Sequence, residues 1–318
     1  MRQRVEVRVP TYKRPDWLRE SLLSLISQDH EDWIALIFDD DPERSAGQVV
    51  SDLSDRRLRY CPNADRMGAA ENINQCFESS SLADGDYAFV LEDDNWIHPD
   101  FISSNLRCLQ TNEVSLMHRN QEIWFRGDGA PVRREGTTLG KLYRPGLLKA
   151  DEIHAASFLF HGVSNGALFW STACQSQLRV PNLYPDPSLH EFFRCMAIVE
   201  ESWFAQEPKA AWADVPKSKT AREYTPNPLF GAYLRTLRKQ AWSRGDSGRM
   251  RAYLEAAKRE GFKGTEDVDL ELAYCGIRPL AKTPGAFEKR IRGVMKGAWF
   301  GWPLRHATLA AVQGNSPY

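Results

Sequence analysis

The sequence predicts an α/β fold in which a mostly parallel sheet is flanked by helices and followed by a helical C-terminal extension. The first hundred residues alternate between strand-like segments and amphipathic helical segments, as strands joined by single helices do. The apolar runs at 34–38 and 87–91 have the composition of strands buried on both faces of a parallel sheet. From residue 230 onward the apolar residues recur at helical spacing.

The N-terminal elements follow from this periodicity in chain order. Residues 5–9 alternate as a strand does, although Glu6 and Arg8 make one of its faces polar. Pro15 suits the first turn of a helix that runs to about Gln28. The elements expected next are a strand at 34–38, a weaker strand at 57–61, a helix at 68–79, a strand at 86–91 and a helix at 101–109. Parallel strands with right-handed crossovers place their carboxyl ends at one edge of the sheet.

The rest of the chain shows fewer elements. The stretch 126–146 is polar and glycine-rich, and it forms either a hairpin or a mobile loop. A strand at 166–171 and a helix at 189–201 are expected next, followed by two antiparallel helices separated by a break at 244–248. A boundary at the proline-containing segment 225–228 divides the chain into a domain of residues 1–225 and a basic helical region of residues 226–318.

The composition excludes several classes of protein. With 42% hydrophobic and 26% charged residues, the chain is neither collagen-like nor disordered. Its apolar runs are far shorter than the roughly 18 residues of a membrane span, and the N-terminus shows no apolar core of a secretory signal. The six cysteines form no CxxC pair, which favours reduced thiols over a disulfide framework or a zinc site. We therefore expect a cytoplasmic protein.

The near-zero net charge of −1 hides a basic C-terminal region. Residues 230–263 contain nine Lys and Arg against three acidic residues, and residues 281–306 contain six against one. Such a face is either a solvated surface or a contact with something anionic. Trp299, Phe300 and Trp302 lie among these cations, so this segment either rests on an anionic membrane surface or packs onto the first domain. We expect no nucleic acid partner.

The strongest chemical signal is the run Glu92, Asp93, Asp94 and Asn95, directly after a predicted strand. Open α/β sheets bind ligands at the carboxyl ends of their strands, and three adjacent carboxylates repel one another unless a cation lies among them. Oxygen ligands suit Mg²⁺ or Mn²⁺, either of which would also bridge a diphosphate. The alternative is an acidic turn that precedes the next helix.

Two more polar clusters follow neighbouring strands. Asp39 and Asp40 end the strand at 34–38, where they either accept hydrogen bonds from a base or ribose or form an Asx turn. The segment Pro10, Thr11, Tyr12, Lys13 and Arg14 offers a hydroxyl, an aromatic face and two cations at the same edge. These residue types are the ones a nucleoside diphosphate requires.

A third cluster lies at the start of the helix predicted at 68–79. Arg66, Gly68 and Asn72 bring a cation, a permissive backbone and an amide to a helix N-terminus, which is a natural place for an anion. Gly68 is equally compatible with a simple turn.

Taken in order, these blocks resemble glycosyltransferase family 2. The resemblance rests on Val9 to Tyr12, Asp39 with Asp40, Gly68 with Asn72, and the motif at 92–95 followed by His98 and Pro99, and it covers about residues 4–200. It implies the GT-A fold, a Rossmann-like nucleotide-binding domain, and inverting transfer from a nucleotide-diphosphate sugar, with a UDP-sugar favoured. The resemblance does not extend to the C-terminal hundred residues.

The resemblance also implies roles for individual residues. Pro10, Thr11 and Tyr12 would line the base and ribose pocket, and Asp39 or Asp40 would bind the base or ribose. Asp94 would be the principal ligand of Mn²⁺ or Mg²⁺. Glu92 stands where the family usually has aspartate, so its longer side chain reaches the metal directly or through water. The other residues expected to bind the nucleotide sugar are Arg14, Arg66, Gly68, Asn72, Asp93 and Asn165.

The general base is expected at the start of a later helix. There the family has a Glu-Asp pair, and this chain has His190 and Glu191. Glu191 is the first choice for the base, because a carboxylate can remove the proton of an acceptor hydroxyl as the bond to the sugar forms. Asp186, five residues upstream, is the alternative. If both are structural, the enzyme is weak or altered.

Several further residues have open roles. Asn165 resembles part of an acceptor-side loop, or it is a turn residue before a glycine. His154 and His161 are either additional metal ligands or structural histidines. Lys217, Lys219 and Arg222 suit a segment that folds over the diphosphate.

The resemblance thus implies an inverting glycosyltransferase of surface glycan or natural-product biosynthesis, acting on a glycan, a lipid-linked or a small-molecule acceptor. Two other functions remain open. A sugar-phosphate nucleotidylyltransferase would have a glycine-rich loop after the first strand, but residues 10–14 contain no glycine. A non-catalytic sugar-nucleotide-binding module, with His190 marking a decayed base motif, would bind a donor without turnover.

Overall fold

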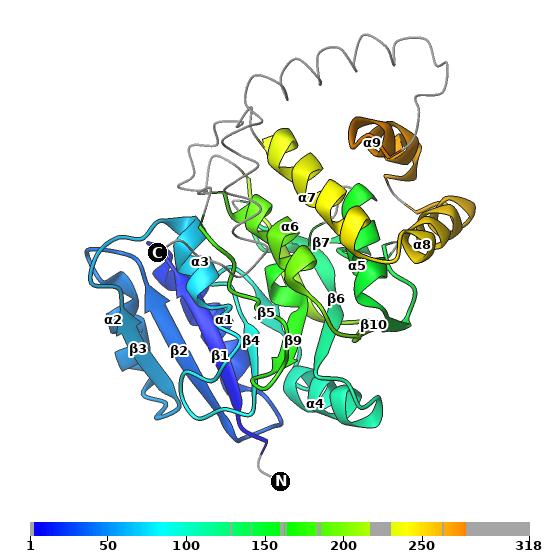
Figure 1. Ribbon diagram of the computed structural model, residues 1–318. Helices are drawn as coiled ribbons and strands as arrows, with labels where there is room; N and C mark the ends of the chain where they lie inside the picture. Colours follow the sequence, from blue (N-terminus) through cyan, green and yellow to red (C-terminus); the bar gives the residue numbers. More distant parts are fainter. Residues whose placement is uncertain are drawn as a thin grey trace.

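The computed structural model describes residues 3–127, 129–140, 142–159, 162, 164–182, 186–216, 230–262 and 264–277. In this part of the chain, a ten-stranded sheet runs through the molecule and carries helices on both faces (Figure 1). The α/β class expected from the sequence is confirmed.

The first half of the chain contains most of the predicted elements. These are β1 (Val5–Thr11), α1 (Pro15–Ile26), β2 (Trp33–Asp39), α2 (Ser45–Leu53), β3 (Leu58–Pro62), α3 (Ala69–Gln75), β4 (Tyr87–Val90), β5 (Trp96–Ile97), α4 (Phe101–Thr111) and β6 (Leu116–Phe125). The second half adds β7 (Val132–Thr137), β8 (Gly146–Leu148), α5 (Ala150–Ala156), β9 (Leu168–Ser171), α6 (Pro187–Ala197), β10 (Ser202–Asp214), α7 (Phe230–Arg244), α8 (Ser247–Arg259) and α9 (Val268–Tyr274).

The sheet has the strand order β3-β2-β1-β4-β9-β6-β10-β5, with β7 paired to β6 and β8 paired to β10. Strands β1 to β4 are parallel to one another, as predicted. Beyond β4 the sheet is mixed, because β9 runs antiparallel to both β4 and β6, while β10 is parallel to β6. The carboxyl ends of β1, β2 and β4 therefore share one edge.

The sequence did not reveal β6 and β10, the longest strands of the sheet. On β6 the consecutive residues His118, Arg119, Asn120 and Gln121 are polar yet buried, so the strand lacks an apolar period. Arg119, Asn120 and Gln121 have hydrogen-bond partners, as in the bond from Arg119 Nε to the Asn105 side-chain oxygen at 2.8 Å. Among the described residues, the two ring nitrogens of the buried His118 have none. The polar stretch 126–146 contains the hairpin strand β7, and the helix expected at 189–201 begins at Pro187 and ends at Ala197.

Two hydrophobic cores lie on opposite faces of the sheet. One packs α1, α2 and α4 against it, through residues such as Leu22, Val49 and Leu106. The other packs α5, α8 and α9 against it, through residues such as Ile153 and Leu254. The C-terminal helices α8 and α9 thus share a core with the sheet domain. Both predicted helices before and after 244–248 are present, whereas the domain boundary at 225–228 lies outside the described residues.

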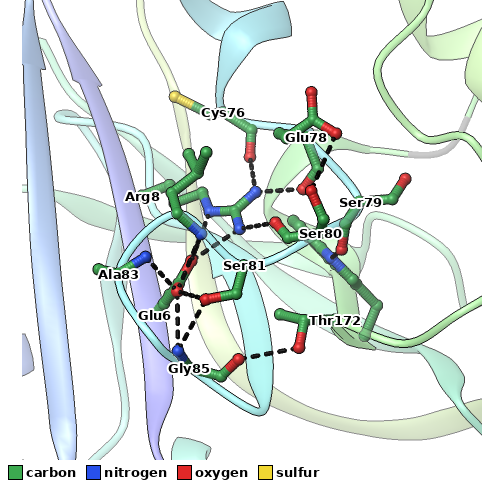
Figure 2. A network of polar contacts seen from close by, with 12 residues as sticks. Glu6, Arg8, Cys76, Glu78, Ser79, Ser80, Ser81, Ala83, Gly85 and Thr172 are labelled. Carbon is green, nitrogen blue, oxygen red and sulfur yellow. Dashed lines mark hydrogen bonds and ion pairs between the residues drawn. The ribbon is translucent and has the colours of Figure 1, made fainter.

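The central strand β1 contains a fully buried ion pair, Glu6 with Arg8, at 2.7 Å (Figure 2). The Arg8 guanidinium donates to the backbone carbonyls of Cys76, Glu78 and Ser80. The Glu6 carboxylate accepts from the Ser81 hydroxyl and from backbone N–H groups including that of Gly85 at 2.9 Å. The face of β1 that the sequence marked as polar therefore binds the loop that leads into β4.

These contacts keep Glu6 ionised inside the protein. Burial acts to raise the pKa of the Glu6 carboxyl, but the hydrogen bonds from Ser81 and the loop backbone outweigh it, and the pKa is lowered. A buried pair that loses one partner typically costs about 3–5 kcal/mol, because the other charge is left uncompensated. The loop position, and with it the start of β4, is fixed by charge as well as by packing.

Two findings concern the cellular setting. Of the helices within the described residues, none combines the length and hydropathy needed to cross a bilayer. All six cysteines lie in the described part of the chain, and none of them forms a disulfide there.

Candidate active site

A cavity of about 110 Å³ lies at the carboxyl ends of β1, β2 and β4. Ten of the residues predicted to bind nucleotide or metal line it, together with Ala69 and Ile73 from α3. These ten are Pro10, Thr11, Tyr12, Arg14, Asp40, Arg66, Asn72, Glu92, Asp93 and Asp94. Segments far apart in sequence thus meet at one rim, as the parallel strand order requires.

Asp93 links the strand ends to each other. Its buried carboxylate accepts hydrogen bonds from Thr11 Oγ1 at 2.9 Å and from the Tyr12 backbone at 3.3 Å, and it pairs with Arg14 at 3.2 Å. Burial, together with the neighbouring charge of Asp94, raises the pKa of Asp93 to about 6. Asp93 therefore anchors the acidic motif to the end of β1.

Asp94 lies between two arginines. Arg14 Nη1 contacts its carboxylate at 2.8 Å, and Arg126 Nη1 donates to its backbone carbonyl at 3.2 Å. Both guanidinium groups stack over Trp17, at 5.0 and 5.1 Å from the ring centroid. Sequence reasoning missed Arg126, because it lies in a polar stretch with no motif around it. This arrangement balances the acidic motif with positive charge.

Glu92 is held by two amides. Its carboxylate accepts from Asn95 Nδ2 at 3.2 Å and from Asn165 Nδ2 at 3.5 Å. Asn165 also resembled a turn residue in the sequence; it begins a short 3₁₀ turn and is buried. The structure thus brings the predicted acceptor-side residue into contact with the acidic motif.

The motif offers carboxylate oxygens but no complete metal cage. Within the described residues, no three His, Cys, Asp or Glu side chains are grouped closely enough to hold a metal ion by themselves. Mg²⁺ is usually bound through one or two carboxylates plus substrate phosphates and waters. The Asp94 and Glu92 carboxylates, both facing the cavity, fit a metal of that kind and do not fit a site built from protein ligands alone.

The two aspartates after β2 have different positions. Asp40 lines the cavity and accepts from the backbone N–H of Met67 at 2.6 Å and of Gly68 at 2.8 Å. Asp39 instead accepts from Tyr60 Oη at 2.9 Å and from the Asp41 backbone at 3.0 Å, which forms an Asx turn. Of the two, only Asp40 is among the described residues that line the cavity.

The third predicted cluster closes the cavity from the α3 side. Gly68 has a φ of +82°, in the left-handed region that favours glycine, and it precedes the first residue of α3. The Arg66 guanidinium lies 4.9 Å from the centre of the Tyr12 ring. Asn72 Nδ2 donates to the backbone carbonyls of Thr11 and Phe38, each at 3.3 Å, so it joins the ends of β1 and β2.

The candidate base Glu191 lies on α6, beside a second cavity of about 740 Å³. Gly162 packs against it so closely that an added Cβ would lie 2.7 Å from Glu191 Cβ. Asp186 is the N-cap of α6, since its Oδ1 accepts from the Ser188 backbone at 2.9 Å. The structure gives Asp186 a role in starting the helix and places Glu191 at a cavity wall.

Arg194, one turn after Glu191, is a residue that sequence reasoning missed. It is fully buried and donates to Asn165 Oδ1 and to the Leu178 carbonyl, each at 3.0 Å. Its guanidinium lies 3.4 Å from the centre of the Phe77 ring. Burial lowers the pKa of Arg194 to about 10, so it remains a cation at neutral pH. Nothing in the local sequence distinguishes it from a surface arginine of an amphipathic helix.

Other predicted residues lie away from this site or outside the described part. His154 Nε2 contacts the Ile198 carbonyl at 3.0 Å and lines a different cavity, beside α7 and α8. His161, Lys217, Lys219 and Arg222 lie outside the described residues, as do Trp299, Phe300 and Trp302.

Comparison with known proteins gives a consistent result. The sequence profile described as "Glycosyl transferase family 2" matches residues 6–165. Protein CgeD of Bacillus subtilis is 30% identical over 149 residues, which are 45% of this chain and 34% of CgeD. The Escherichia coli protein named UDP-Glc:alpha-D-GlcNAc-diphosphoundecaprenol beta-1,3-glucosyltransferase WfgD is 28% identical over 120 residues, which are 37% of this chain and 46% of WfgD. The match spans about a third to a half of these curated relatives.

Solved structures share the fold at low sequence identity. S. aureus TarS 1–349 in complex with UDP superposes with a TM-score of 0.60 at 13% identity, covering 98% of this chain and 88% of that one. The mannosyltransferase PcManGT from Pyrobaculum calidifontis, in complex with GDP-Man and Mn²⁺, gives a TM-score of 0.50 at 15% identity, covering 99% and 87%. The resemblance seen in the sequence motifs is confirmed.

Proposed function

Because this chain belongs to glycosyltransferase family 2, we propose that it is an inverting enzyme that transfers a sugar from a nucleotide-diphosphate donor, preferably a UDP-sugar, to an acceptor hydroxyl. The observation that carries the proposal is the convergence of residues 10–14, 40, 66 and 92–94 on one cavity at the strand ends. A UDP-glucose-dependent relative and a fold neighbour bound to UDP support the choice of donor.

In the proposed complex, the nucleotide lies over the ends of β1 and β2. Tyr12 and Asp40 face the base and ribose, and Arg66, stacked on Tyr12, and Arg14 are cations close to the diphosphate. Asn72 and Gly68 hold the surrounding backbone in place. The Asn72 side-chain amide donates to the carbonyl at the end of β1, and the Gly68 backbone N–H donates to Asp40, which fixes the loop before α3. Asp39 supports the turn, because its carboxylate accepts from Tyr60 and Asp41 and, unlike Asp40, it is not among the described residues that line the cavity.

We assign Asp94 and Glu92 as the residues that hold Mn²⁺ or Mg²⁺. The fold neighbour PcManGT was solved with Mn²⁺ and a sugar nucleotide, and the carboxylates here suit a metal that takes its other ligands from phosphate. When bound, the metal supplies positive charge to the departing diphosphate. Arg14, already beside Asp94, can turn to the same phosphates.

Glu191 is proposed as the general base. It removes the acceptor proton while the acceptor oxygen attacks the anomeric carbon from the face opposite the diphosphate, which inverts the configuration. Asp186 remains the alternative base, although its N-cap hydrogen bond favours a structural role. A glycan or lipid-linked glycan is the favoured acceptor, in line with the name of the WfgD relative, and the six cysteines without a disulfide fit a cytoplasmic site of action.

A thermal-shift panel tests the proposal. We expect UDP-, GDP- or dTDP-sugars to raise the Tm only in the presence of Mn²⁺, because the metal bridges the carboxylates and the donor diphosphate in the proposed complex. The shift should be measurable, since a ligand at 100 times its Kd stabilises a fold by about 2.7 kcal/mol. Released nucleotide is measured in parallel, with and without candidate acceptors. Binding without any hydrolysis or transfer would favour the non-catalytic module, and no response to any nucleotide would refute a nucleotide-sugar site.

A further inference from the structure

The second cavity, next to Glu191, is built by five separate parts of the chain. Strands β6 and β10, β7 with the residues that follow it, Gly162 with Ser164, and helix α6 each contribute to its wall. The described lining residues are Asn120, Ile123, Gly136, Thr137, Thr138, Leu139, Gly140, Leu142, Gly162, Ser164, Ser188, Glu191, Phe192, Gln206 and Trp212. Its volume of about 740 Å³ is within the range of cavities that take a small molecule.

The lining combines hydroxyl groups, amides and aromatic rings. Four side chains carry hydroxyls, two carry amides, and Phe192 and Trp212 supply flat apolar surfaces. Glu191 is the one ionisable side chain among the described lining residues. The nearest cations of β7, Arg133 and Arg134, do not line it and are paired with Glu122 at 3.2 Å and Asp214 at 3.3 Å.

Hydrogen bonds between the walls fix this shape. Asn120 Nδ2 donates to Thr137 Oγ1 at 2.9 Å and to the Gln206 carbonyl at 3.1 Å, which ties β7 to the bulge of β10. Ser164 Oγ donates to Gln121 Oε1 at 2.9 Å. The residue after Ser164 is Asn165, which contacts Glu92 of the first cavity, so one segment separates the two cavities.

We propose that this cavity binds the acceptor as an uncharged, polyhydroxylated carbohydrate, a substrate class that rests on the transferase function proposed above. A sugar ring presents hydroxyls at its edge and C–H groups on its faces, which match hydroxyl or amide partners and an aromatic ring. A phosphate or carboxylate on the sugar ring inside the cavity would meet the Glu191 carboxylate, and desolvating a like charge there is unfavourable. The diphosphate of a lipid-linked acceptor would therefore lie outside the cavity.

The chemistry of transfer fits this placement. One acceptor hydroxyl lies at Glu191 and gives it the proton as the new oxygen–carbon bond forms. The bond between the anomeric carbon and the diphosphate breaks, and its electron pair leaves with the diphosphate. A neutral acceptor adds no negative charge to a site that already holds the acidic motif and the departing diphosphate.

Saturation-transfer NMR tests the substrate class on the full chain with UDP and the diamagnetic Mg²⁺. The probes are methyl glycosides of glucose, galactose, mannose and N-acetylglucosamine, and the matching 6-phosphates. We expect saturation transfer from the protein to at least one neutral glycoside, and weaker saturation transfer to the 6-phosphate of the same glycoside. Trp212→Ala should weaken binding about three- to tenfold, as loss of an aromatic platform does.

Trp124→Ala is the matched control. Trp124 follows Ile123 on β6 but is not among the described residues that line the cavity, and its ring packs against Trp96 at 5.4 Å between the ring centroids. It should leave the NMR signals unchanged. Three results would overturn the proposal. They are saturation transfer to the phosphates that equals or exceeds that to the neutral glycosides, no saturation transfer to any neutral glycoside, and an equal loss of binding in the two tryptophan variants. Donor hydrolysis, measured on parallel samples that contain a UDP-sugar in place of UDP, reports separately on the transferase function.

A second observation concerns the buried Arg194. It joins α6, which carries Glu191, to Asn165, and Asn165 in turn contacts Glu92. A buried guanidinium with bonds to Leu178 and Asn165 and a ring beneath it has little freedom to move. The Asn165 amide is thereby oriented, with its oxygen toward Arg194 and its nitrogen toward Glu92.

We infer that Arg194 is a positioning residue that sets the Glu92 carboxylate through Asn165. Because Arg194 occupies the Asn165 oxygen, only the amide nitrogen is left to face Glu92. The same helix turn carries the base, so the positions of the base and of the proposed metal ligand are coupled. This inference rests on the proposed role of Glu92.

Mn²⁺ binding measured by EPR, with UDP present, tests the coupling without turnover. Asn165→Leu should raise the Kd for Mn²⁺ about tenfold, and Arg194→Lys should do the same in the wild-type background but add little to Asn165→Leu. Asn105→Leu is the control, because Asn105 is a buried asparagine that accepts from Arg119 at 2.8 Å on the other side of the sheet. It loses a comparable bond but should leave the Kd unchanged.

A shift in Kd for Asn165→Leu no larger than that for Asn105→Leu would overturn the positioning role. The positioning role would also be overturned if the effects of Asn165→Leu and Arg194→Lys on the free energy of Mn²⁺ binding were fully additive in the double variant. If the wild-type chain with UDP binds no Mn²⁺, the proposed metal function fails too, and that result is distinct from a mere lack of difference between variants.

Discussion

Replacing Glu191 by glutamine is expected to slow sugar transfer by about 10²- to 10⁴-fold while donor binding stays near normal. The glutamine amide has the shape of the carboxylate but cannot take the acceptor proton. Glu191 lines the second cavity and is not among the described residues around the first, so the donor contacts should survive. Initial rates of nucleotide release with acceptor, alongside the Tm shift caused by donor and Mn²⁺, measure the two effects.

Asp186→Asn separates the two candidate bases. Asparagine is as good an N-cap as aspartate, so α6 should keep its start and the fold its stability. If Glu191 is the base, Asp186→Asn transfers sugar at close to the wild-type rate. A rapid Glu191→Gln enzyme combined with a slow Asp186→Asn enzyme would reverse the assignment.

Changing Asp94 to asparagine is expected to reduce metal-dependent transfer by about 10³-fold or more, since a bound metal contributes several kcal/mol of charge stabilisation at the leaving group. The substitution removes the carboxylate that faces the cavity beside Arg14. Asp93 still holds Arg14 at 3.2 Å and Thr11 at 2.9 Å, so the rim should keep its shape. Rates across a Mn²⁺ titration measure the loss.

Glu92→Asp and Glu92→Gln complete this series. Glu92→Asp introduces the residue usual for the family and should stay active, whereas Glu92→Gln should raise the Mn²⁺ requirement less than Asp94→Asn does. An Asp94→Asn enzyme with an unchanged Mn²⁺ response would contradict the assignment of Asp94 as principal ligand. A Glu92→Gln enzyme that loses more than Asp94→Asn would exchange the two roles.

The rim of the first cavity could be predicted because it depends on short-range signals. Apolar strands followed by Asp40 or by the 92–94 motif reveal both a strand end and a polar side chain at it. Parallel order then brings these ends together without knowledge of any long-range contact. The choice between Asp39 and Asp40 was beyond the sequence, because it depends on Tyr60 and on the loop at 63–68.

The second cavity could not be predicted for the opposite reason. Its walls come from β6, β7 and β10, whose buried polar residues find partners on distant strands, so the hydrophobic period fails. Arg126 and Arg194 were missed for the same reason. Each is surrounded by aromatic rings and carbonyl groups from other elements, and those partners become apparent only in three dimensions.

The ion pair of Glu6 and Arg8 limits how this chain can vary. Surface connections usually accept insertions, because their backbone binds only water. The connection from residue 76 to residue 85 is different, since its carbonyls and N–H groups are the solvation shell of two charges in the middle of the sheet. An added residue there would move these backbone groups away and leave a buried charge without its hydrogen-bond partners. The length of the connection from residue 76 to residue 85 is therefore fixed. Insertions that add a new binding loop to this protein would have to be made elsewhere.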